Sequence, residues 1–440
     1  MRYRAWAGIV AATLALGTHA ATDASGIRVD DGARAIALSP APDQPPEALM
    51  FEHAGLPVAV ARRLVVRAQT EAFAARLVAS GEGGVVSLLA ELGDEALFLL
   101  PLEPAHDPFE AARRVSAWPE VIYAQPDLLF ATRATGGQRP SYDMDGFDLA
   151  RTIGLGAAWQ HSVGRGVTIA VIDDGFDLSH PQFAGTALPD GVKAFSDATG
   201  SRHHGTRVAG ILFGRHDGAP PEGIAPEATL LPIAARDGWT STLVAAFALA
   251  FDSGADIISA SWVIPHATRP LRDLIAHHLD PAGGGRGVLV VVSAGNSARS
   301  RFPDGLIHLP GVVPVAATDH ALRPLFLDPD LTEPLCAPGM LDTVSTLPDR
   351  ATEKLGASSA ATPVVAGILA LMRAANPLLD RRKLVEFLGS SSRPSLPLDP
   401  DRRCRVVDAG AALAAVDNPI RPADTERDRD PARSRSSPPD

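Results

Sequence analysis

The chain is poor in cysteine, lysine and aromatic residues, and it lacks long apolar runs. Its two cysteines are too few for a four-cysteine zinc site or for a fold built on several disulfides. Lysine occurs only at positions 193, 354 and 383, so arginine supplies nearly all of the positive charge. Beyond the N-terminus, no stretch reaches the 18 consecutive apolar residues that a transmembrane helix needs. We therefore expect no membrane span.

The overall composition is that of a folded protein. Hydrophobic residues make up 46% of the 440 residues and charged residues 21%, which excludes disorder throughout the chain. The 39 glycines and 38 prolines follow no triplet repeat, which excludes collagen. The formal net charge of −11 argues against a nucleic-acid partner, because phosphate binding needs a basic surface. The length allows two or three domains.

The N-terminus has the order of a secretory signal peptide. Arg2 and Arg4 precede the apolar run 5–16, and small residues follow up to Ala20 and Ala21. A disordered alanine-rich start is the alternative. We predict cleavage near Ala20 and a mature protein that is secreted or periplasmic. In such an oxidising compartment Cys336 and Cys404 could form one disulfide.

The rest of the chain divides by pattern. Residues 21–60 are mixed and partly proline-rich, and we interpret them as a leader or linker. Residues 61–135 alternate in the order β-α-β-β-α-β, which predicts a small α+β, ferredoxin-like domain. Residues 143–416 alternate apolar strands with helices, which predicts an α/β domain with a parallel sheet. Residues 417–440 are polar and predict a disordered tail.

An aspartate ends the first strand of the α/β domain. Strand 167–172 delivers Asp173 to its carboxyl end, where the working residues of open α/β sheets gather. Alone, such an Asp could simply cap a turn. A dinucleotide site is excluded because Gly164 and Gly166 precede the strand, and the glycines at 283–285 lack the residues of a phosphate loop.

Three more polar residues stand at the ends of predicted elements. His204 opens a helix of small residues, Asn296 follows strand 288–293, and Ser359 heads the apolar helix 360–374. Each has an ordinary structural explanation: His204 could be solvated, Asn296 could be a turn residue, and Ser359 could be an N-cap. Their order in the chain makes four coincidences together implausible.

These segments resemble the signature motifs of the subtilisin-like serine proteases. The resemblance covers about residues 145–415 and extends upstream through the Pro119–Asp127 segment. It is strong because Asp, His and Ser stand in the chain order of subtilisin. The matching segments are Val171-Ile172-Asp173-Asp174-Gly175, His204-Gly205-Thr206, Ser293-Ala294-Gly295-Asn296, Ser359-x-Ala361-x-Pro363, Gly223-Ile224-Ala225-Pro226 and Ala337-Pro338-Gly339.

The resemblance implies a catalytic role for four residues. Ser359 would be the nucleophile, His204 its general base, and Asp173 the carboxylate that orients the imidazole. Asn296 would bind the oxyanion together with the backbone N–H of Ser359. Family spacing selects Ser359 over Ser358, His204 over His203, and Asp173 over Asp174.

The resemblance also places a substrate cleft. One side would be Ser261, Trp262 and Val263, facing Gly295 across the first specificity pocket. The opposite edge would be Gly238 and Trp239. Val263 stands where glycine is common in the family, which implies a pocket for small or slim P1 side chains.

Two further departures from the family pattern concern the nucleophile and calcium. Ala357 replaces the glycine two residues before the nucleophile, with Gly356 shifted one place earlier. No cofactor is expected. Calcium is possible but unsupported, because Gln182 replaces a carboxylate ligand and loop 214–222 lacks asparagines.

The sequence thus predicts a secreted serine endopeptidase made as a zymogen and acting on protein or peptide substrates. Its own prodomain would be an intramolecular inhibitor, cut off within 131–142, and we expect a monomer. The alternatives are a narrow maturation protease and an inactive homologue that only binds. A solute-binding protein of two similar lobes is excluded, since the chain shows one.

Overall fold

The structure is a computed structural model of the chain. It describes residues 27–32, 34–40, 49–80, 86–130, 147–190, 204–218, 221–235, 237–280, 287–296, 302–346, 352–397 and 402–417. The predicted signal peptide, the predicted cleavage region and the tail beyond Asp417 lie outside these residues. The chain forms two compact units. The first unit comprises residues 1–134, 237–248 and 268–274, and the second unit comprises the remainder.

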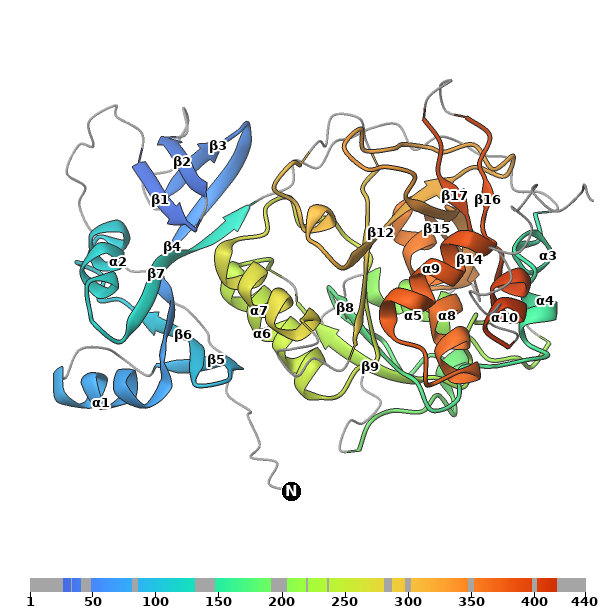
Figure 1. Ribbon diagram of the computed structural model, residues 1–440, viewed down its shortest axis with the longest axis horizontal. Helices are drawn as coiled ribbons and strands as arrows, with labels where there is room; N and C mark the ends of the chain where they lie inside the picture. The colour runs from blue at the N-terminus through green and yellow to red at the C-terminus, as the bar shows by residue number, and fades with distance from the viewer. Residues whose placement is uncertain are drawn as a thin grey trace, which may run out of the picture. The chain divides into compact units, whose positions relative to one another are not determined.

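The N-terminal part of the first unit is an antiparallel sheet with two helices on one face (Figure 1). The central strand pairs with three other strands, and apolar residues of both helices fill the core beneath, among them Phe73 and Val115. The element order matches the predicted β-α-β-β-α-β. The elements are β4 (Leu56–Gln69), α1 (Thr70–Ser80), β5 (Ser87–Leu92), β6 (Glu95–Pro101), α2 (Pro108–Ser116) and β7 (Val121–Phe130).

The prediction of a leader or linker over 21–60 is wrong for the described part of that segment. β1 (Ile27–Asp31), β2 (Arg34–Pro40) and β3 (Met50–His53) extend the sheet beside β4 in antiparallel order. Alternate residues of these strands point inward and form a second core on the sheet. The core residues include Val29, Ile36, Leu38, Phe51, Val58 and Leu128.

The second unit is built on a parallel sheet in the order β9-β8-β10-β11-β12-β13-β17, with β16 antiparallel at the edge. The predicted parallel sheet of apolar strands is confirmed. Their two faces are both buried, which explains why they appear as continuous hydrophobic runs. The strands are β8 (Thr168–Asp173), β9 (Thr229–Ala234), β10 (Ile257–Ala260), β11 (Leu289–Ser293), β12 (Val312–Thr318), β13 (Leu335–Pro338), β16 (Arg393–Pro394) and β17 (Arg405–Val406).

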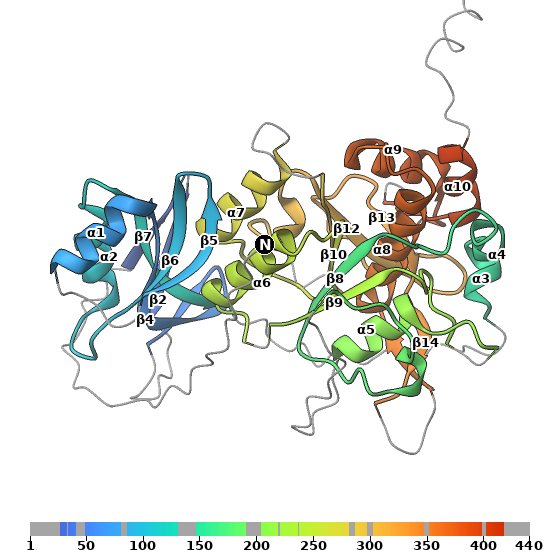
Figure 2. The same ribbon diagram turned by 90° about the horizontal axis from the view of Figure 1, so that it is seen from below.

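One helix lies at the centre of the second unit. α8 (Ser358–Ala375) packs against β10 to β13 and against α5 (His204–Phe213), and α9 (Arg381–Ser391) and α10 (Ala409–Asp417) lie beside it (Figure 2). α8 is long and apolar enough to cross a membrane, but it is mostly buried inside the protein, as a core helix is. The remaining elements are α3 (Leu149–Thr152), α4 (Leu155–Ala158), η1 (Pro181–Phe183), α6 (Thr240–Asp252), α7 (Arg269–Leu279), η3 (Leu306–His308), β14 (Met340–Val344) and β15 (Thr352–Gly356).

The sheet topology brings the predicted site residues to one edge. β9 pairs with one side of β8 and β10 pairs with the other, so the winding reverses direction at β8. Open α/β sheets bind ligands at the carboxyl ends of the strands beside such a reversal. Asp173 is the last residue of β8, and Ser261 directly follows β10.

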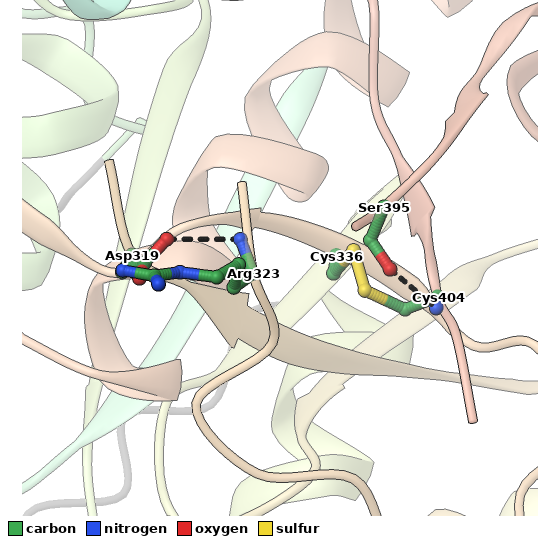
Figure 3. Close-up of a disulfide and its surroundings, with 5 residues drawn as sticks. All are labelled: Asp319, Arg323, Cys336, Ser395 and Cys404. Atoms are coloured by element: carbon green, nitrogen blue, oxygen red, sulfur yellow. Dashed lines mark hydrogen bonds and ion pairs between the residues drawn. A yellow bond between two sulfur atoms is a disulfide. The ribbon is translucent and has the colours of Figure 1, made fainter. Parts of the chain in front are cut away.

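The predicted disulfide is confirmed. Cys336 in β13 and Cys404, just before β17, are both fully buried and bonded to each other (Figure 3). The hydroxyl of Ser395 accepts a hydrogen bond of 3.1 Å from the backbone N–H of Cys404. The bond therefore joins two neighbouring strands at the edge of the parallel sheet.

Candidate active site

An aspartate–histidine pair stands at the carboxyl end of β8. The Nδ1 atom of His204 lies 2.9 Å from Oδ1 and 3.0 Å from Oδ2 of Asp173, whose side chain is almost fully buried. The neighbouring Asp174 uses its carboxylate differently, because it accepts the backbone N–H of Gly205 at 3.1 Å. Asp173 is therefore the carboxylate that faces the imidazole, and Asp174 supports the start of α5.

Gly205 lets the helix approach the strand closely enough for this pair to form. A Cβ atom on Gly205 would lie 2.5 Å from the carbonyl oxygen of Gly175 and 2.9 Å from the Cβ of Asp173. Neither neighbour is the end of a flexible side chain, so any larger residue would push α5 away from β8. Steric exclusion of any side chain therefore explains why glycine follows the histidine.

The charges of the pair prepare His204 to act as a base. Burial lowers the pKa of His204, but the hydrogen bond and the charge of Asp173 outweigh burial, and the pKa is raised above its ordinary value. Burial raises the pKa of Asp173, opposed by the hydrogen bond from His204. Because a carboxylate accepts the Nδ1 proton, the Nε2 atom of neutral His204 carries a free lone pair.

This raised pKa predicts the acid limb of the activity profile. As the pH falls through the pKa of His204, the imidazole takes up a proton at Nε2 and can no longer accept one from a nucleophile. We expect kcat/KM to fall on the acid side with a midpoint above the usual value of about 6.5. A pH series of kcat/KM on a peptide substrate measures it, and a midpoint below about pH 6 would contradict the assignment.

The two serines at the start of α8 have different surroundings. Ser359 is partly exposed, and its hydroxyl donates a hydrogen bond of 2.9 Å to the carbonyl oxygen of Ser261. Ser358 is completely buried. Ser359 is therefore the more accessible of the two serines.

Ser358 holds the side chain of Asn296. The Oδ1 atom of Asn296 accepts the backbone N–H of Ser358 at 2.9 Å and its hydroxyl at 2.5 Å. The Ser358 hydroxyl also lies 2.6 Å from the hydroxyl of Ser293, which can donate to it. Because both donors are on Oδ1, the amide group of Asn296 is turned to the other side, where it can donate to an oxyanion.

Replacing Ser358 by alanine should disturb this orientation. The change removes one of the two donors to Oδ1 of Asn296, a loss of about 1.4 kcal/mol, which corresponds to about tenfold in kcat. KM should change little, because the donor acts on the transition state. Ser293→Ala is the matched control. It removes a hydroxyl that contacts the Ser358 hydroxyl and leaves both hydrogen bonds from Ser358 to Asn296 in place. Equal losses in both variants would contradict the role given to Ser358.

Ala357 has an unusual backbone conformation. Its φ of 56° and ψ of −148° lie in a region that is nearly restricted to glycine. The preceding Gly356 ends β15 as an extended residue and does not take over this conformation. The strain therefore falls on an alanine immediately before the two serines of α8.

Replacing Ala357 by glycine should stabilise the protein. Relief of the strained conformation gains about 1–3 kcal/mol, and the added freedom of the unfolded chain costs about 0.4–1 kcal/mol. A net gain of about 1 kcal/mol raises the melting temperature by roughly 2–4 °C in a domain of this size. Scanning calorimetry of the inhibitor-treated protein measures the shift. A lower melting temperature than wild type would show that Ala357 is not strained.

The predicted cleft residues of the second unit lie beside these groups. A Cβ atom on Gly295, which has a φ of 93°, would lie 3.6 Å from Cγ2 of Val263, so the valine side chain faces the glycine. The indole N–H of Trp262 donates to the carbonyl of Ile172 at 2.8 Å. Trp262 therefore ties the segment after β10 to the end of β8, and this contact is structural.

The other two predicted cleft residues belong to the first unit. Gly238 has a φ of 66°, and a Cβ atom there would lie 3.3 Å from the side chain of Leu129 in β7. The guanidinium of Arg63 stands over the ring of Trp239, 5.3 Å from its centroid. Both residues therefore contact the N-terminal sheet.

The loop where relatives could hold calcium is closed by hydrogen bonds here. The side-chain oxygen of Gln182 accepts the backbone N–H of Arg215 at 3.0 Å, and the carbonyl of Gly214 accepts the N–H of Gly223 at 2.8 Å. The imidazole of His216 bonds to the carbonyl of Gly223 at 2.8 Å. Each of these oxygens accepts one hydrogen bond within the loop, and Arg215 adds a positive charge beside them, which is unfavourable for a calcium ion.

Comparison with known proteins agrees with this geometry. The model of the subtilase family matches residues 164–407, more than half of the chain. The major intracellular serine protease of Bacillus subtilis is 30% identical over 263 residues, which cover 55% of this chain and 80% of that protein. A calcium-dependent protease of Trichormus variabilis is 32% identical over 272 residues, or 51% of this chain. The chain spans only 41% of the length of that second relative.

Two solved structures have folds similar to that of this chain. Fervidolysin from Fervidobacterium pennivorans, a keratinolytic enzyme, aligns with a TM-score of 0.63 at 19% identity, over 82% of this chain and 62% of that one. The prenylagaramide maturation protease PagA aligns with a TM-score of 0.50 at 27% identity, over 60% of this chain and 98% of that one. The fervidolysin match shows the fold alone.

Proposed function

Because the chain belongs to the subtilase family of subtilisin-like serine proteases, we propose that it is an endopeptidase whose nucleophile is Ser359. The observation that carries the proposal is the Asp173–His204 pair at the same sheet edge as the Ser359 hydroxyl. Asn296, turned by Ser358 to offer its amide group, adds an oxyanion donor. A protein that only bound peptides would need none of these four residues, which argues against the inactive homologue.

In the proposed reaction, Ser359 attacks the carbonyl carbon of the scissile peptide bond. Rotation about its Cα–Cβ bond moves the hydroxyl from the carbonyl of Ser261 to Nε2 of His204, which takes the proton. The amide of Asn296 and the backbone N–H of Ser359 bind the oxyanion. Protonated His204 then gives its proton to the leaving amine, and a water molecule hydrolyses the acyl-enzyme by the reverse of these steps.

The N-terminal domain is the proposed intramolecular inhibitor. Within the first unit, Asp127 accepts the backbone N–H and the hydroxyl of Ser241 at 2.9 and 2.6 Å, which caps α6. Asp31 accepts the backbone N–H of Arg269 at 2.6 Å, which caps α7. The side chain of Leu129 approaches Gly238, on the predicted edge of the cleft. As the family resemblance implies, a cut within 131–142 would release this domain.

Secretion and substrate range complete the proposal. The signal-like N-terminus and the Cys336–Cys404 disulfide both favour an oxidising compartment, either the periplasm or the extracellular medium. Val263 facing Gly295 favours small P1 side chains. A narrow maturation protease is the second candidate, and the similarity to the maturation protease PagA favours it.

Covalent labelling tests the proposal. A fluorophosphonate probe reacts with an activated serine, so mass spectrometry of the labelled protein should place the adduct on Ser359. Ser358→Ala should keep the label and Ser359→Ala should lose it. Intact mass over time and casein hydrolysis then separate the candidates. Release of the N-terminal domain together with casein cleavage supports a broad endopeptidase, and release without casein cleavage supports the narrow one. A folded wild type that takes up no label overturns the proposal.

A further inference from the structure

The loop between β12 and β13 contains a buried carboxylate, and one of its two oxygens accepts no hydrogen bond from the described residues. The side chain of Asp328 has no exposed surface. Its Oδ1 atom accepts the backbone N–H of Asp330 at 2.9 Å, whereas its Oδ2 atom has no hydrogen-bond partner among the described residues. A buried carboxylate oxygen in that state calls for a compensating positive charge.

A buried imidazole nitrogen faces this oxygen. His308, at the end of η3, has its Nε2 atom buried and without a hydrogen-bond partner among the described residues. The distance from Nε2 to Oδ2 of Asp328 is 4.0 Å, which is too long for a hydrogen bond. Two ligands that each lie about 2.0–2.2 Å from a shared metal ion are separated by roughly 3–4 Å. The gap therefore has the size of a bridging ion.

A third possible ligand, the carboxylate of Asp330, lies beside His308 and Asp328 at the protein surface. One ligand atom from each of His308, Asp328 and Asp330 lies within 4.8 Å of the other two. Asp330 is exposed, so an ion could enter from solvent and keep a water molecule as a further ligand. Arg402 donates to the backbone carbonyl of Leu327, which fixes the chain beside Asp328 and leaves the carboxylate of Asp328 available.

We propose that His308, Asp328 and Asp330 bind a divalent transition-metal cation of the Zn²⁺ class. One imidazole and two carboxylates are typical Zn²⁺ ligands, whereas Ca²⁺ takes six to eight oxygens and would not use the imidazole. The ion would join the segment before β12 to the segment after it. Its effect would be on thermal stability, because none of the three residues belongs to the proposed catalytic set.

Cobalt spectroscopy tests the proposal on the full chain. The protein is treated with phenylmethylsulfonyl fluoride to prevent self-digestion, stripped with a chelator, and titrated with Co²⁺ as the probe. We expect visible absorption bands that saturate at one ion per chain and disappear when Zn²⁺ is added. Millimolar Ca²⁺ should leave them unchanged. Zn²⁺ should also raise the melting temperature.

Single substitutions decide whether these residues bind the ion. His308→Gln and Asp328→Asn should each weaken Zn²⁺ binding at least tenfold and abolish the cobalt bands, and Asp330→Asn should weaken binding less. His106→Gln, which changes an exposed histidine, is the matched control and should bind as wild type does. If Asp328→Asn does not fold, the result for His308→Gln alone tests the proposal. Wild type without cobalt bands, or His308→Gln with the same bands and affinity, overturns the proposal and leaves a His308–Asp328 ion pair as the explanation.

Discussion

Replacing Ser359 by alanine is expected to reduce kcat by about 10⁶, the size of the loss measured for the equivalent change in subtilisin, a member of the same family. The methyl group cannot form the acyl-enzyme, and only oxyanion binding and substrate positioning remain. The rate on a chromogenic peptide measures the loss, and intact mass shows whether the N-terminal domain stays attached.

Ser358→Ala is the control for this change, because it removes a hydroxyl one residue away. It should lose only about tenfold, as argued from its hydrogen bond to Asn296. If Ser358→Ala were the inactive variant and Ser359→Ala retained activity, the register of the motif would be wrong by one residue. If neither changed the rate, the active site would lie elsewhere.

Replacing Asp173 by asparagine is the second large expected effect, a fall in kcat of about 10⁴ at neutral pH. The introduced carboxamide would turn an N–H group toward Nδ1 of His204, so the imidazole would carry its proton on Nε2. That nitrogen could then no longer accept the proton of Ser359. The geometry should be preserved, because aspartate and asparagine have the same shape.

The matched control is Asp174→Asn, which alters the adjacent carboxylate. Asp174 accepts the N–H of Gly205, and an asparagine oxygen can accept it equally well. We expect less than a tenfold change in kcat and an unchanged circular dichroism spectrum in both variants. A fall of about 10⁴ in Asp174→Asn and none in Asp173→Asn would exchange the two roles.

The sequence allowed the parallel sheet to be predicted because its strands are buried on both faces and therefore form continuous apolar runs. The strands of residues 27–60 were missed because they are short, alternate in burial and adjoin a proline-rich segment. β7 continues through Pro126 because, among the described strands, it pairs with β4 alone and is therefore an edge strand, where proline is tolerated.

The candidate site was predictable where residues belong to a contiguous motif. The structure brings Asp173 and His204 together and places the Ser359 hydroxyl on the segment after β10. The orienting role of Ser358 was not predictable, because the serine doublet posed only a question of register. The contact of Gln182 with Arg215 joins residues 33 positions apart and follows no pattern. The same holds for His308 and Asp328, which come together only in the folded chain.

The Cys336–Cys404 bond determines what happens when one molecule of this protease cleaves another. The two cysteines are 68 positions apart, and the covalent ring that they close contains Ser359 and all of α8. A single cut anywhere between residues 337 and 403 opens this ring but releases no fragment. A molecule damaged in this way keeps its nucleophile attached to the sheet that holds Asp173. It would migrate as one band on a non-reducing gel and as two bands after reduction, and its damage would pass unnoticed without that comparison.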